Sequence, residues 1–157
     1  MATYEITSIG TIYTPFEQKV GVPVQAKMGG SIEGYIEMKD PFVEGLKDLE
    51  GFSHAHLIYV FNRHNDYKMI VRPYMDETLR GVYATRCPKR PNQIGLSLVE
   101  LVEIKGSRVS FKGVDMLNGT PLMDIKPYYH DFDHRENSSA GWLDKVKKRR
   151  VVADDRF

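Results

Sequence analysis

Short segments with the residue composition of β-strands recur along the chain, and few segments have the pattern of a helix. Residues 31–38 alternate clearly, so that Ile32, Ile36 and Met38 fall on one face of a strand. Residues 54–61 are instead almost continuously apolar, which is typical of a buried strand. Further predicted strands cover residues 4–13, 69–72, 81–85, 95–104, 108–114 and 122–126.

Helical spacing is confined to two short segments. Residues 41–49 begin with a proline, which favours the first turn of a helix, and residues 142–150 follow a turn-rich stretch. Asn118 and Gly119 predict a tight reversal, with a strand on each side of it. Many short strands separated by Gly and Pro, without alternating long helices, indicate an all-β protein that forms a closed β-barrel.

The length of 157 residues favours one compact domain. We expect residues 1–133 to form the barrel, which carries most of the candidate site residues discussed below. The chain becomes polar after Asp133, so we expect residues 134–157 to form a polar and basic C-terminal extension.

Charge, cysteine content and hydropathy limit the partners and the location. The 22 Lys and Arg residues nearly balance the 21 Asp and Glu residues, so any contact with nucleic acid must be local. The single Cys87 cannot form an internal disulfide, which suits a reducing compartment. No apolar stretch is long enough to cross a membrane, and the first residues lack the pattern of a secretory signal, so we expect a cytoplasmic protein.

Two segments combine prolines with polar side chains that can bind a ligand. In residues 9–30, Pro15 and Pro23 favour an extended backbone, and Gln25 offers an amide donor and an acceptor. In residues 85–95, two prolines stiffen a loop that presents Arg86 and Arg90, and guanidinium groups held in this way bind carboxylate or phosphate.

A third segment, residues 115–133, carries a set of proton-transfer groups. Asp124, Lys126 and Tyr128 alternate, so an extended chain places all three on one face. A carboxylate, an ammonium and a phenol that converge can move a proton, whereas an ion pair that only supports the barrel is the alternative.

A fourth segment, residues 51–65, contains two histidines that leave a metal site open as an alternative. His54 and His56 are two residues apart and point the same way on a strand. Together with acidic and histidine side chains further along the chain they could serve a metal-dependent hydrolase; these are His130, Asp131, Asp133 and His134. Because no zinc-binding spacing is present, we expect no metal.

Together these four segments resemble the tRNA (adenine-37) N6-methyltransferase family of TrmO/YaeB-like proteins. The resemblance covers Ile9 to about Tyr128, and the motifs occur in the family's order. The matching stretches are IGTIYTPF with Lys19, Pro23 and Gln25, then GLKDLEGFSHAHLIYVF, TRCPKRPNQIGLSLVEL and DMLNGTPLMDIKPY.

The resemblance implies a β-barrel methyltransferase, unrelated to the doubly wound kind, that uses S-adenosylmethionine and forms a homodimer. Its implied substrate is the anticodon loop of tRNA, in which N6 of a threonylcarbamoylated adenosine 37 receives the methyl group. By position, the cofactor contacts are expected at Pro23, Val24, Gln25, Asn62, Arg63, Arg86, Leu96, Gly119, Thr120, Pro121 and Leu122.

Within that reading, Asp124 and Tyr128 are the expected bases for the N6 proton, and Lys126 is expected to stabilise the developing negative charge. Bacterial relatives usually carry a further C-terminal domain, so RNA docking here is expected to rest on basic and amide groups of this chain. These are Arg90, Asn92, Lys147, Lys148, Arg149 and Arg150. A non-catalytic RNA-binding barrel, with bases stacked on aromatic side chains, is a second alternative.

Overall fold

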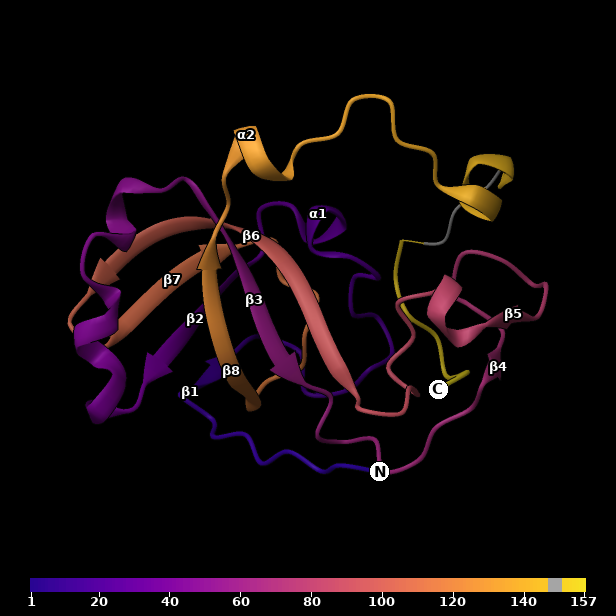
Figure 1. Cartoon of the computed structure of the whole chain (residues 1–157), viewed down its shortest axis with the longest axis horizontal. Helices are drawn as coiled ribbons and strands as arrows, with labels where there is room; N and C mark the ends of the chain where they lie inside the picture. Colours follow the sequence, from indigo (N-terminus) through magenta and orange to yellow (C-terminus); the bar gives the residue numbers. More distant parts are fainter. Residues whose placement is uncertain (147–150) are drawn as a thin grey trace.

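The computed structural model describes residues 1–146 and 151–157, and its main body is a closed antiparallel barrel of six strands (Figure 1). The neighbours around the barrel follow the order β1-β2-β7-β6-β3-β8. The strands are β1 (Gly10–Tyr13), β2 (Glu33–Met38), β3 (His54–Val60), β6 (Ile94–Lys105), β7 (Arg108–Lys112) and β8 (Thr120–Pro127). The all-β barrel predicted from the sequence is therefore confirmed.

Alternation along each strand decides which side chains fill the barrel. On β3, Ala55, Leu57 and Tyr59 are buried, whereas the residues between them are partly exposed. Phe111 of β7 and Ile12 of β1 are fully buried in the same core. Removal of this apolar surface from water is the main force that closes the barrel.

One end of the barrel is covered by two short 3-10 helices, η1 (Asp40–Leu46) and η2 (Leu49–Gly51). The sequence predicted one helix over residues 41–49, and this was wrong in detail. The chain breaks at Asp48, whose φ of 68° is left-handed and cannot continue a right-handed helix. Leu46 and Leu49 are nevertheless both buried, as the apolar spacing required.

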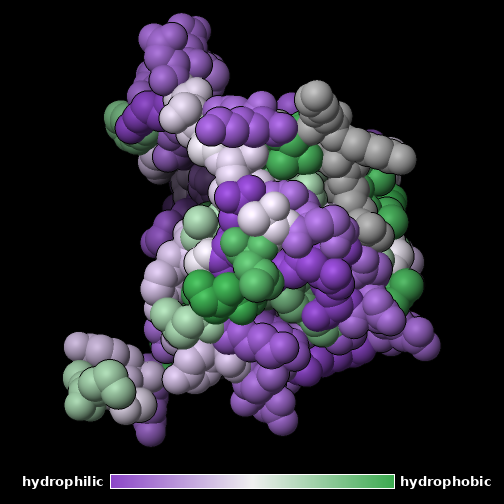
Figure 2. Space-filling model, turned by 90° about the vertical axis from the view of Figure 1, so that its right-hand side faces the viewer, coloured by the Kyte–Doolittle hydropathy of each residue, from purple (hydrophilic) through white to green (hydrophobic). Residues whose placement is uncertain are grey.

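A small two-stranded sheet lies beside the barrel and consists of β4 (Ile70–Val71) and β5 (Arg80–Gly81). The predicted strand over residues 81–85 is wrong, because the chain turns at Gly81 into the 3-10 helix η3 (Val82–Ala84). Figure 2 shows this side of the molecule, where hydrophobic residues gather amid hydrophilic ones. Val82 and Cys87 are buried in a second, smaller core beneath it.

After β8 the chain passes over the barrel to the side of β4 and β5 (Figure 1). It forms the short helix α2 (His130–Asp133) and then the 3-10 helix η4 (Gly141–Lys145). Residues 151–157 return to the loop before α1 (Ala26–Gly29), where Pro23 and Val152 form a β-bridge. Whether residues 134–157 form a separate extension stays a prediction, but Ala153 and Phe157 of this segment are buried.

The reversal expected at Asn118 and Gly119 exists, but the strands before and after it do not pair with each other. Gly119 has a φ of 82°, which favours glycine. However, β7 pairs with β2 and β6, whereas β8 pairs with β1 and β3. The turn therefore carries the chain across the barrel instead of joining two neighbouring strands. Within the described residues, no helix is both long and apolar enough to span a membrane.

Candidate functional site

A cavity of about 1270 Å³ lies between the barrel wall and the segments beside it. Strand β6 forms one wall, and the loop at residues 19–30 forms another. Helix η3, the loop that follows it, and the buried side chains of the C-terminal segment complete the site. Each of the four segments singled out in the sequence also contributes lining residues, among them Gln25, Asn62, Arg86 and Asp115.

Most of the residues predicted to bind the cofactor line this cavity. Those that do are Pro23, Val24, Gln25, Asn62, Arg63, Arg86, Leu96 and Thr120. The other three do not: Gly119 is exposed at the turn, Pro121 pairs with Thr11 in the barrel wall, and Leu122 is fully buried. The alternation of β8 explains the difference, since neighbours along a strand point to opposite sides.

Two arginines at the cavity have different surroundings. Arg86 donates a hydrogen bond to the amide oxygen of Gln25 at 2.8 Å, so a rigid loop and the loop before α1 meet there. Arg63 donates instead to two backbone carbonyls, those of Glu17 and Asn118, the latter at 3.0 Å. Arg63 therefore holds two loops together, and Arg86 is the better placed of the two for a ligand carboxylate.

The predicted RNA contacts fall into three groups. Arg90 lines the cavity but donates to the carbonyls of Thr85 and Cys87, which fixes the loop. Asn92 is exposed next to it. The basic run from Lys147 to Arg150 lies outside the described residues.

The predicted proton-transfer groups lie on the outside of the barrel. Lys126 and Asp124 form an ion pair at 3.0 Å, with 65% and 45% of their side-chain surfaces exposed. Neither lines the cavity, and neither does Tyr128. The ring of Tyr128 packs edge-on against His54, at 6.2 Å between centroids, and His54 does line the cavity. Of the three groups, Tyr128 is therefore separated from the cavity by one side chain, that of His54.

The histidines considered as metal ligands are dispersed into separate contacts. His54 shares a hydrogen bond of 2.7 Å with Ser53, and His56 lies 3.5 Å from Asp133. His130 stacks on His134. In the part of the chain that the structure describes, no group of three or more His, Cys, Asp or Glu side chains is arranged to hold a metal ion.

The sequence analysis missed a partly buried carboxyl group at the cavity. Asp115 lines it and accepts a 2.6 Å hydrogen bond from Ser97 of β6, which in turn bonds Tyr59 of β3 at 2.9 Å. Burial raises the pKa of Asp115 to about 7, although the hydrogen bond from Ser97 opposes this shift. Strongly shifted pKa values in a cavity are typical of functional groups. The available signal was Ser97, a polar residue at an inward position of β6 next to Val99.

Positive charge dominates the cavity and its edge. Six of the described lining residues are Lys or Arg, and only Glu100 and Asp115 are acidic. A second hollow of about 320 Å³ shares Lys19, Arg63 and His64 with the first and adds Lys89. This arrangement suits an anionic partner at the mouth of the cavity.

Comparison with known proteins places the chain in a family. Residues 11–134 match the family described as the tRNA-methyltransferase O N-terminal domain. A probable S-adenosyl-L-methionine-binding protein of Pyrococcus abyssi is 51% identical over 94% of this chain and 80% of its own length. The tRNA (adenine(37)-N6)-methyltransferase of Escherichia coli is 34% identical over 90% of this chain.

The fold agrees with a solved member. The crystal structure of TrmO from Pseudomonas aeruginosa superimposes with a TM-score of 0.75 and 34% identity, covering 89% of this chain. The chain spans only 62% of that protein and 65% of the E. coli enzyme. Sequence motifs, barrel topology and relatives all agree, and the chain belongs to the tRNA-methyltransferase O N-terminal domain family.

Proposed function

We propose that this protein is an S-adenosylmethionine-dependent methyltransferase that acts on N6 of adenosine 37 in tRNA. Two similar proteins support this proposal, because one is named for binding S-adenosyl-L-methionine and the other for methylating adenine 37 of tRNA. The observation that carries the proposal is the cavity itself, which brings together eight of the eleven residues expected to bind the cofactor.

The cavity suits S-adenosylmethionine in its chemistry, because ligand sites usually have mostly apolar walls and a few polar groups. Its volume of about 1270 Å³ exceeds the roughly 300–1,000 Å³ that is usual for one small ligand, so it also leaves room for an acceptor group. Val24, Leu96 and Met116 supply apolar surface here, and Arg86 supplies a donor pair for a carboxylate. The partly buried Asp115 offers a negative group that a donor on the ligand would satisfy.

When bound, the cofactor supplies a methyl group on a positively charged sulfur. The protein's task is to align this methyl with the acceptor nitrogen, and such positioning contributes roughly 7–11 kcal/mol. Tyr83 is 70% exposed at the cavity and offers an aromatic face that tolerates a cation or stacks on a base.

The acceptor proposed is adenosine that already bears a threonylcarbamoyl group on N6. The remaining N6 proton must leave, and Asp124 or Tyr128 would accept it while Lys126 stabilises the negative charge. Tyr128 contacts His54 in the cavity wall, so an adenosine lying over the outer face of β3 would reach both places.

Phosphates of the anticodon loop would bind at the second hollow. Lys19 and Arg63 there carry positive charge next to the cavity, whereas Lys89 is paired with Asp66 at 3.2 Å, and contacts of cations with phosphate dominate affinity for nucleic acid. A tRNA substrate is consistent with a cytoplasmic location.

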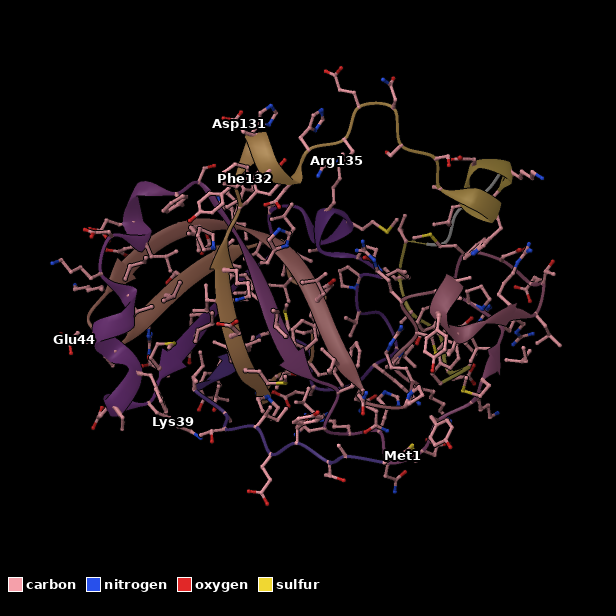
Figure 3. All side chains as sticks on the ribbon, viewed as in Figure 1. Met1, Lys39, Glu44, Asp131, Phe132 and Arg135 are labelled. Atoms are coloured by element: carbon pink, nitrogen blue, oxygen red, sulfur yellow. The ribbon has the colours of Figure 1, made fainter. Side chains whose placement is uncertain are left out.

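A homodimer is part of the proposal. Leu96 and Leu98 on the outer face of β6 are 47% and 39% exposed, and Phe132 of α2 is 67% exposed. Figure 3 shows Phe132 at the periphery of the molecule. Half-exposed leucines in a row on a strand suit contact with a second copy. Leu98→Lys would be expected to shift the protein from dimer to monomer in light scattering.

One assay tests the function. The protein is incubated with S-adenosylmethionine and with tRNA that carries or lacks the threonylcarbamoyl group, and the nucleosides are then analysed by mass. A methyl gain on the modified tRNA alone supports the full proposal, and a gain on both supports the coarser activity. Binding of tRNA without any methyl gain would favour the non-catalytic barrel, and stoichiometric metal in elemental analysis would favour a hydrolase.

A further inference from the structure

The floor of the cavity carries a chain of three hydrogen-bonded groups. Ser97 has a single hydroxyl proton, which it donates to ionised Asp115 at 2.6 Å, so the hydroxyl of Tyr59 must donate to Ser97 at 2.9 Å. Tyr59 and Ser97 are 3% and 2% exposed. The chain therefore starts inside the barrel and ends on a carboxyl group at the cavity.

Two close backbone approaches fix the position of this chain. The ring of Tyr59 lies over Gly95, its partner in the β3–β6 pairing, and a Cβ at Gly95 would lie 2.1 Å from that ring. On the other side, Gly29 packs against the backbone of Val114, where a Cβ would lie 2.3 Å from the carbonyl oxygen. Only glycine fits at either place. The close approach at Gly95 fixes Tyr59 against β6, and the close approach at Gly29 fixes α1 against Val114, the residue before Asp115.

The charge of Asp115 is not neutralised by the protein. Among the described residues no Lys or Arg forms an ion pair with it, and Arg86 acts on it only through space. Ser97 and backbone N–H groups donate hydrogen bonds that favour the ionised form, but burial outweighs them, so the pKa of Asp115 lies near 7. A ligand that brings a positive charge would remove this cost.

We infer that Asp115, oriented by Ser97 and Tyr59, binds the α-ammonium of the ligand's amino-acid moiety, while Arg86 binds the carboxylate of that moiety. This inference rests on the proposed function, in which the ligand is S-adenosylmethionine. An arginine and an aspartate that are not paired with each other form a matched receptor for a zwitterion. Neutral ribose hydroxyls or an adenine amine would satisfy the hydrogen bond but not the charge.

The sulfonium is the wrong cation for Asp115. Its charge disappears during methyl transfer, so a carboxylate beside it would stabilise the starting state more than the transition state. The ammonium keeps its charge throughout, and its binding costs nothing in the chemical step.

Calorimetry with four ligands tests the assignment. The ligands are S-adenosylmethionine, S-adenosylhomocysteine, decarboxylated S-adenosylmethionine and methylthioadenosine. We expect Asp115→Asn to weaken the first three by roughly 10- to 100-fold, since each carries the ammonium. Methylthioadenosine lacks it, and its affinity should change less than about threefold. Arg86→Gln should weaken the first two but spare the decarboxylated compound.

Further variants separate orientation from charge and guard against misfolding. Ser97→Ala keeps the carboxyl group and removes its support, so it should show a smaller loss with the same ligand pattern. Glu103→Gln, an exposed acid on β6, serves as the matched control and should leave all affinities unchanged. Thermal unfolding shows that each variant is folded.

Each outcome has a distinct reading. Equal loss for methylthioadenosine would assign Asp115 to the nucleoside, and loss for the sulfonium compounds but not for S-adenosylhomocysteine would assign it to sulfur. Either result, or no loss at all, overturns the inference while the proposed function stands. Failure of the unaltered protein to bind any of the four ligands would overturn both.

Discussion

The cavity floor and the outer face of β8 each carry an aspartate with a hydrogen-bonding partner, and their environments are opposite. Asp115 is partly buried at the cavity, where Ser97 holds it, and its pKa is raised to about 7. Asp124 pairs with Lys126 at a surface where both side chains are about half exposed or more. Burial makes ionisation of Asp115 unfavourable, and such a carboxyl group at a cavity indicates a ligand site. Ionisation of the exposed Asp124 costs little, so its surroundings do not reveal its role, and kinetic assays must test it.

The largest expected effect is a loss of stability at Gly95, which packs against the ring of Tyr59. Gly95→Ala would push the ring of Tyr59 out of its place, and we expect a loss of roughly 2–4 kcal/mol in the free energy of unfolding. Urea denaturation measures this loss. Gly45→Ala is the control, because nothing lies within 4 Å of the added Cβ. Equal stability of the two variants would show that the floor is not rigid.

The next effect concerns turnover. Asp124→Asn should lower turnover by roughly 100-fold, about 2.7 kcal/mol in the barrier, and leave cofactor affinity unchanged, because Asp124 lies outside the cavity. Single-turnover assays on modified tRNA and calorimetry measure the two quantities. Unchanged turnover would remove Asp124 from catalysis and leave only its ion pair.

A smaller effect is an increase in stability, whereas most substitutions lower the free energy of unfolding. The pKa of Asp115 is about 7 in the folded protein against an ordinary 3.8, so the folded state binds the proton more tightly. Its stabilising contribution is present below pH 4 and is lost as the pH rises through 7. Asp115→Asn should therefore stabilise the free protein by about 1–2 kcal/mol at pH 8 and by less at pH 5.5. A uniform loss of stability at both values would contradict this in urea denaturation.

The smallest effect concerns the surface pair. A double-mutant cycle with Asp124→Asn and Lys126→Gln should give a coupling free energy of unfolding below about 0.5 kcal/mol, because exposed ion pairs are weak. A coupling above about 1 kcal/mol would mean that the pair supports the barrel, as the structural alternative held.

The strand pattern predicted the barrel, because alternation reports which face of a strand is buried. It did not predict the order of the strands, since the turn at Gly119 leads to a strand that pairs elsewhere. Proline and arginine in the loop at residues 85–95 predicted a ligand site there, and Arg86 and Arg90 of this loop line the cavity. Asp115 was missed because its significance depends on Ser97 and Tyr59, which only the folded barrel brings to it.

Arg63 has a consequence for how ligands leave. Its guanidinium bonds the carbonyls of Glu17 and Asn118, and the side chain of Asn118 also bonds Glu17 and the backbone of Thr14. Because these bonds link three segments at one guanidinium group, loosening of one segment weakens the hold on the other two. We therefore expect this rim of the hollow to open as a unit when a ligand enters or leaves.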